Sequence, residues 1–238
     1  MLAFGVQYDY EKPKYELRKG GENAMNRILF VCTGNTCRSP MAEGIMRKIL
    51  SEEGLTDIEV RSAGVAAYEG TQLSDHAASV LKNKGCVGPS ASTFLSQILI
   101  DWADLVLTMT SSHKRHTIQL YPEAVDKVYT LKEYVQDDPQ LADKISEMES
   151  LITELELKQA LSGQITEEER ERVLTLQKEL PLPDIADPFG GSYREYEKCA
   201  WEIEECLIKL AAKLKKRPLT SGADGGSRYG KLGFTANA

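Results

Sequence analysis

The sequence of 238 residues predicts an α/β fold with a four-stranded parallel sheet flanked by helices. Four short segments are predicted strands: 58–64 alternates between apolar and polar residues, whereas the runs at 28–31, 104–109 and 127–131 are mostly apolar. Apolar runs are typical of the buried strands of a parallel sheet. Helical patterns separate the runs, and such alternation indicates right-handed crossovers between parallel strands.

The segment that follows the first run organises the prediction. The strand at 28–31 leads into a short loop that begins with Cys32 and ends with Arg38. We expect Ser39 to be the N-cap of the next helix and Pro40 its first residue. Backbone N–H groups at a helix N-terminus form an anion site, and Arg38 can hold two phosphate oxygens. These surroundings favour a Cys32 thiolate nucleophile; the alternative is a buried core cysteine beside an ordinary turn.

The loop sequence Cys-Thr-Gly-Asn-Thr-Cys-Arg-Ser-Pro at 32–40 resembles the phosphate-binding loop of the low-molecular-weight protein tyrosine phosphatase family. Within that family it looks most like the bacterial protein arginine phosphatases. The resemblance extends from Asn26 to Arg217 with one long interruption. We expect the strand order 2-1-3-4, with the loop at the carboxyl end of the first strand, where ligands bind in open α/β sheets.

The resemblance implies a two-step hydrolysis. Cys32 attacks phosphorus, Arg38 holds the phosphoryl oxygens, and Asp187 acts first as general acid and then as general base. Asp187 precedes a proline and an aromatic residue, as the family's acid does; the alternative is a turn aspartate before proline. The predicted contacts to phosphate or substrate are Thr33, Gly34, Asn35, Thr36, Cys37, Ser39 and Phe189.

Asn35 has a structural role under either reading of the loop. Asparagine tolerates left-handed backbone geometry better than most residues. In the family, a serine at the position of Ser62 helps to hold this asparagine in its strained conformation.

The other cysteines have two interpretations. Cys37 could form a reversible disulfide with Cys32 that protects the nucleophile from over-oxidation, or it could be a small buried side chain. Cys199 and Cys206 are seven residues apart on one predicted helix, about 10.5 Å of rise, which is too far to bridge. We interpret both as packing or surface residues, and Cys86 stands alone.

The substrate prediction depends on two places. Tyrosine phosphatases of the family usually have a bulky aliphatic residue at position 36, where this chain has Thr36, as the arginine phosphatases do. They also tend to carry two aromatics after the acid, whereas here Phe189 is followed by two glycines. Both features predict hydrolysis of phosphoarginine in proteins. The alternatives are a tyrosine phosphatase, an arsenate reductase and a non-catalytic phosphate-binding scaffold.

Composition limits the partners. A net charge of −7 argues against non-specific nucleic-acid binding, and no apolar run is long enough for a membrane span. Residues 1–24 lack an apolar signal core, and the five cysteines have no disulfide-framework pattern, so we expect a cytoplasmic protein that acts on phosphorylated proteins. Because His76, His113 and His116 lack a metal-ligand spacing, we predict neither metal nor other cofactor.

We expect three parts in the chain. Residues 1–25 form an N-terminal extension and 218–238 a C-terminal tail, both predicted to be disordered. Residues 26–217 form the phosphatase domain.

A helical hairpin at 136–182 is the predicted interruption of that domain. The segment lacks strand signals, and Thr166 with Glu169 matches a capping box that opens its second helix. The apolar stripes of the hairpin could simply pack on each other or could form a dimer. Because the hairpin directly precedes the acid loop, it could also dock a partner or shade the active site.

Overall fold

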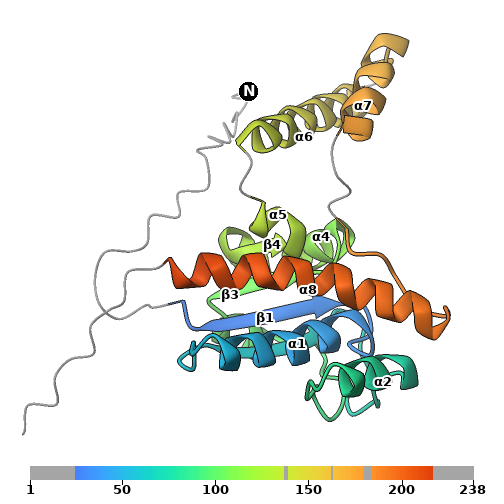
Figure 1. Cartoon of the computed structure of the whole chain (residues 1–238). Helices are drawn as coiled ribbons and strands as arrows, with labels where there is room; N and C mark the ends of the chain where they lie inside the picture. The colour runs from blue at the N-terminus through green and yellow to red at the C-terminus, as the bar shows by residue number, and fades with distance from the viewer. Residues whose placement is uncertain (1–24, 137–138, 162, 180–183, 217–238) are drawn as a thin grey trace, which may run out of the picture. The chain divides into compact units, whose positions relative to one another are not determined.

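The computed structural model describes residues 25–136, 139–161, 163–179 and 184–216 (Figure 1). The predicted extension and tail lie outside these residues, apart from Met25. The elements in order are β1 (Arg27–Cys32), α1 (Arg38–Glu52), β2 (Glu59–Gly64), α2 (Asp75–Asn83), α3 (Gln97–Trp102), β3 (Leu105–Thr108), α4 (Ser111–Leu120), the 3-10 helix η1 (Pro122–Lys127), β4 (Val128–Thr130), α5 (Leu131–Val135), α6 (Pro139–Ala160), α7 (Glu167–Glu179) and α8 (Tyr193–Lys215).

The four strands form one parallel sheet in the order β2-β1-β3-β4, which confirms the predicted topology. In the register of the sheet, Ile28 of β1 pairs with Val60 of β2 and with Leu105 of β3. The central strand is fully buried from Ile28 to Val31. Burial on both faces explains why this strand is a continuous apolar run rather than an alternating one.

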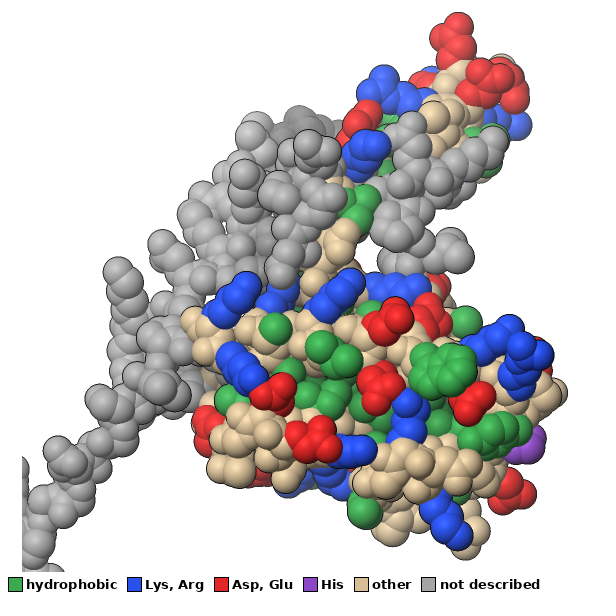
Figure 2. Space-filling view, in the orientation of Figure 1, with side chains coloured by type: hydrophobic (Ala, Val, Ile, Leu, Met, Phe, Trp, Pro, Cys, Tyr) green, Lys and Arg blue, Asp and Glu red, His purple; other side chains and the backbone are tan. Residues whose placement is uncertain are grey.

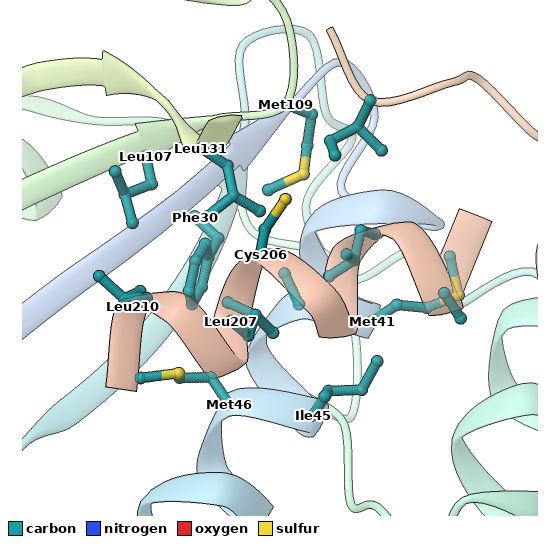
Figure 3. Packing of buried hydrophobic residues seen from close by; sticks show 14 of the residues in the cluster. Phe30, Met41, Ile45, Met46, Leu107, Met109, Leu131, Cys206, Leu207 and Leu210 are labelled. Carbon is teal, nitrogen blue, oxygen red and sulfur yellow. The ribbon is translucent and has the colours of Figure 1, made fainter. Parts of the chain in front are cut away.

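Alternate residues of β1 contribute to two separate hydrophobic clusters. Ile28 and Phe30 pack with residues of α1 and α8, whereas Leu29 and Val31 pack with residues of α3 and η1. Figure 3 shows Phe30 between the sheet and the side chains of α8. Because successive strand residues point to opposite faces, one short strand anchors helices on both sides of the sheet.

Helix α8 is amphipathic. Its buried stripe packs along α1 over one face of the sheet (Figure 1). The face of the molecule in Figure 2 carries charged side chains of both signs around scattered apolar ones. The buried residues of α8 are Tyr196, Cys199, Ala200, Ile203, Cys206, Leu207, Leu210, Ala211 and Leu214.

Three short elements were not predicted from the sequence. They are α3, η1 and α5, which have six, six and five residues. Elements of fewer than two turns are too short for a helical period to be seen in the sequence. The elements η1 and α5 include Lys127 and Leu131, the two ends of the strand predicted at 127–131, so β4 is shorter than predicted.

Helices α6 and α7 form a helical hairpin. Lys158 pairs with Glu169 at 2.6 Å, and Glu147 pairs with Arg172, so the two helices run antiparallel. Thr166 and Glu169 exchange the two hydrogen bonds of a capping box at the start of α7. That this hairpin is an insertion relative to the family stays a prediction.

Candidate active site

The predicted phosphate loop connects the carboxyl end of β1 to α1. Cys32 is the last residue of the strand and is 3% exposed. The thiol accepts two hydrogen bonds, from the Asn35 backbone N–H at 3.3 Å and from the Ser39 hydroxyl at 3.0 Å. Two donors aimed at one sulfur stabilise its thiolate form.

The predicted N-cap at Ser39 is wrong. Helix α1 begins at Arg38, with Cys37 as an N-cap that makes no side-chain capping bond. Ser39 is already inside the first turn, where its hydroxyl donates to Cys32 Sγ instead of capping the helix. Pro40 is third in the helix, which is still within the turn where a missing N–H costs little.

Asn35 connects the loop to three other segments. It has a φ of +52°, the one non-glycine residue with positive φ among those described, as predicted. Its side-chain amide donates to Ser39 and Ser62 hydroxyls at 2.9 Å each, and its Oδ1 accepts from the Thr93 backbone N–H at 2.7 Å. These bonds offset the cost of the left-handed backbone and hold the loop open.

A buried carboxylate continues this network beneath the loop. The Ser62 hydroxyl donates to Glu43 of α1, and Glu43 also pairs with Arg47. Burial raises the pKa of Glu43, while the Ser62 and Arg47 contacts oppose that rise. Because the Asn35 amide nitrogen can only donate, the Ser62 hydroxyl oxygen accepts from it and the Ser62 O–H donates to Glu43. The carboxylate therefore orients the hydrogen bonds of the loop.

Gly64 at the end of β2 makes close contact with the same loop. A Cβ at this position would lie 2.4 Å from the Thr33 carbonyl oxygen and 2.8 Å from the Asn35 nitrogen. Contacts this short require the backbone to shift, so the second strand can support the loop only with glycine here.

The predicted acid lies beside Arg38. The guanidinium NH2 of Arg38 donates to Asp187 Oδ2 at 2.7 Å, and its NH1 donates to the Ile185 carbonyl at 3.4 Å. The Arg38 side chain is 6% exposed, and that of Asp187 is 54% exposed. Phe189 is 78% exposed, and its backbone N–H donates to Asp187 Oδ1 at 3.1 Å. Residues 149 positions apart thus meet at one site.

His113 is a site residue that the sequence analysis missed. It is buried, with Nε2 2.7 Å from Thr33 Oγ1 and Nδ1 2.8 Å from Thr110 Oγ1. Burial, followed by the charge of Arg38, lowers its pKa to about 4, so the ring is neutral near pH 7. A signal was present, because β3 pairs with β1 and the first turn of α4 must therefore lie near the loop after β1.

An open hollow of about 390 Å³ connects these groups. Its lining combines the loop, the first turn of α4 and the acid segment, and consists of Thr33, Arg38, Thr110, Ser112, His113, Asp184, Ile185, Ala186 and Asp187. Asp184 has a structural role, since its Oδ1 accepts hydrogen bonds from the backbone N–H and the hydroxyl of Ser111. Asp187 is therefore the better placed of the two carboxylates to act on a ligand.

Comparison with known proteins identifies the family. The family model described as "Low molecular weight phosphotyrosine protein phosphatase" matches residues 27–156. The chain belongs to this phosphatase family.

Relatives within the phosphatase family carry two different names. The chain is 39% identical over 189 residues to a protein-arginine-phosphatase of Geobacillus stearothermophilus, covering 79% of this chain and 96% of that one. It is 36% identical to the low molecular weight protein-tyrosine-phosphatase PtpB of Staphylococcus haemolyticus, covering 79% and 97%. A solved YwlE arginine phosphatase mutant with a phosphorylated active site serine aligns with a TM-score of 0.60 at 35% identity, covering 80% and 96%.

All five cysteines of this phosphatase are free thiols in the structure. Cys37 Sγ lies 3.2 Å from the Tyr196 hydroxyl and 3.5 Å from Ser74 Oγ. Burial raises the pKa of Cys199 to about 12 and also raises that of Cys206, consistent with the packing role predicted for both. A reversible Cys32–Cys37 disulfide stays a prediction.

Two further findings concern the described part of the phosphatase. Among these residues, no group of three His, Cys, Asp or Glu side chains is arranged to hold a metal ion. None of the described helices is both long and apolar enough to cross a bilayer.

The neutral His113 makes the stability of the protein depend on pH. Its pKa is lower in the folded protein than the ordinary 6.5, so the unfolded chain binds this proton more readily. The contribution is complete above pH 6.5 and is lost as the pH falls toward 4, a loss of roughly 3 kcal/mol. We expect His113→Gln to lose less unfolding free energy between pH 7 and 4.5 than the wild type, measured by urea denaturation.

The exposed histidine of the same helix is the matched control. His116→Gln should leave the pH dependence of the wild type unchanged. Equal pH dependence in both variants would contradict the assigned state of His113.

Proposed function

We propose that the protein is a protein arginine phosphatase that hydrolyses phosphoarginine through a phosphocysteine intermediate. The observation that carries the proposal is the convergence of Cys32, Arg38 and Asp187 at the N-terminus of α1. The relative named protein-arginine-phosphatase supports the choice of substrate. The second candidate is a tyrosine phosphatase, which the PtpB relatives favour.

In the first step the Cys32 thiolate attacks phosphorus, so that an S–P bond forms as the P–N bond breaks. The Arg38 guanidinium and the loop N–H groups hold the phosphoryl oxygens and stabilise the charge of the transition state. Protonated Asp187 gives its proton to the departing guanidine nitrogen, and the arginine side chain leaves. The phosphorylated serine in the YwlE mutant structure supports an attack from this position in the loop.

In the second step Asp187 acts as a base. The carboxylate takes a proton from a water molecule, and the resulting hydroxide attacks phosphorus. The S–P bond breaks, inorganic phosphate forms, and Cys32 returns as a thiolate. The Ser39 hydroxyl bond to Cys32 Sγ stabilises this leaving thiolate. The loop itself supplies the positive charge for both steps.

The walls of the site support phosphoarginine over phosphotyrosine. Thr36 presents a small polar side chain that is half-buried. After Phe189 the chain turns at Gly190, whose φ of +76° disfavours any side chain, so the acid loop provides one aromatic wall rather than two. The Asp187 carboxylate can form an ion pair with the positively charged guanidinium of the arginine product.

The first test compares two substrates. We expect wild-type protein to hydrolyse a phosphoarginine protein faster than a phosphotyrosine peptide, measured as phosphate release under matched conditions. Cys32→Ser should lose at least about a thousandfold on both, because the hydroxyl is a poorer nucleophile. Faster hydrolysis of phosphotyrosine would favour the second candidate, and unchanged activity of Cys32→Ser would overturn the mechanism.

The second test concerns the wall at position 36. Thr36→Ile replaces a polar wall with a bulky apolar one, which suits a flat aromatic ring. We expect the ratio of phosphotyrosine to phosphoarginine kcat/KM to rise about tenfold or more. Thr36→Ser keeps the hydroxyl and is the control. A ratio that does not move with isoleucine would show that position 36 is not the selector.

We also propose that the hairpin is a contact surface for a second copy of the chain or for a protein substrate. Leu157, Leu161 and Leu174 are exposed on it, and exposed apolar side chains in a group mark interaction sites. Changing all three to serine should lower the mass measured by light scattering, or slow hydrolysis of phosphoproteins but not of small phosphates. If neither changes, the hairpin has no such role. The cytoplasmic location stays a prediction.

A further inference from the structure

The segment before Asp187 is held by three side chains from two other elements, α5 and α8. Lys132 of α5 donates to the Asp184 carbonyl at 2.9 Å, and Glu202 of α8 accepts from the Ala186 N–H at 3.2 Å. Cys199, also on α8, donates to the Ala186 carbonyl at 3.4 Å. The backbone on both sides of Ile185 is therefore fixed by groups outside the segment.

Lys132 and Glu202 also bind each other. Their charged atoms are 2.6 Å apart, and the side chains are 26% and 30% exposed. An exposed ion pair usually contributes little, because two long side chains lose freedom to form it. Here each partner is half-buried and also bonds to the acid segment, so the pair joins α5 and α8 across Asp184 and Ala186.

Ile185 completes the attachment from the opposite side. Its N–H donates to the Met109 carbonyl at 2.8 Å, its carbonyl accepts from Arg38, and its side chain is 1% exposed. The segment is thereby tied both to the end of β3 and to the guanidinium that binds phosphate.

The carboxylate of Asp187 makes two hydrogen bonds in the described structure. It accepts them from Arg38 and from the Phe189 N–H, and more than half of the side chain is exposed. The backbone of 184–186, which leads directly into Asp187, therefore contributes to the position of the carboxylate. A proton donor that is misplaced by about 1 Å can lose a hundredfold in rate.

We propose that Lys132 and Glu202 are positioning residues that place Asp187 for proton transfer to the leaving group. The proposal rests on the acid role given to Asp187 in the proposed function. The pair acts through the backbone of 184–186 and touches no reacting atom.

The test measures kcat/KM, which reports formation of the phosphocysteine, on two small phosphates. Phenyl phosphate has a poor leaving group that needs a proton, whereas 2,4-dinitrophenyl phosphate has a good one that leaves without it. Glu202→Ala and Lys132→Met should each lose about tenfold or more on phenyl phosphate and less than about twofold on the dinitrophenyl ester. A merely structural loss would lower both substrates equally and would overturn the proposal.

Helix α8 offers a matched control. Glu204 pairs with Lys84 at 2.6 Å, and the two side chains are 36% and 18% exposed. In the described part of the chain, this ion pair includes no residue of the acid segment 184–187. Glu204→Ala should leave the ratio of the two substrates unchanged. If Glu202→Ala and Glu204→Ala behave alike, the pair with Lys132 has no positioning role.

Asp187→Asn separates failure of this proposal from failure of the proposed function. It should show the same selective loss on phenyl phosphate, at least as large as that of Glu202→Ala. If Asp187→Asn lowers both substrates equally, the acid role itself is wrong. If Asp187→Asn is selective and neither Glu202→Ala nor Lys132→Met is, only the positioning proposal fails.

Discussion

The side-chain amide of Asn35 is the contact on which the site depends. It joins the loop to α1 through Ser39 and to β2 through Ser62, while its oxygen holds Thr93. Ser62 lies next to Phe30 in the sheet register, so correct pairing of the two strands places the partner that the loop needs. Pairing of β1 with β2 therefore places the Ser62 hydroxyl where it can bond to Asn35. This bond stabilises the otherwise unfavourable backbone of Asn35.

The sequence predicted the sheet, its order and the residues of the loop because each depends on local pattern. Buried strands are apolar runs, and the loop residues are adjacent in the chain. Ser39 was misassigned because Ser-Pro resembles a helix start, whereas the helix begins two residues earlier, at Arg38, and the Ser39 hydroxyl donates to Cys32. His113 was missed because one histidine in a polar helix looks like a surface residue. Its contact with Thr33 exists only once β3 lies beside β1.

The acid segment could be recognised from the sequence but not placed by it. Asp187 lies far along the chain from Arg38, and residues 137–138 and 180–183 lie outside the described structure. The contacts that fix the segment come from single side chains of α5 and α8, Lys132 and Glu202. Lysine and glutamate are common on helix surfaces, so nothing in their spacing distinguishes these two from neighbours that face solvent.

The buried Glu43 has a consequence for protein engineering. The residues from Cys32 to Arg38 contain the proposed nucleophile and the loop groups that would hold a phosphate, yet their shape depends on Glu43, Ser62 and Gly64 outside the loop. If residues 32–38 alone were grafted between a strand and a helix of another protein, they would lack Glu43, which accepts the hydrogen bond from Ser62. They would also lack Gly64, where a side chain would clash with the backbone of the loop. A transplantable unit must therefore include β1, β2 and α1, together with Thr93, whose N–H bonds to Asn35.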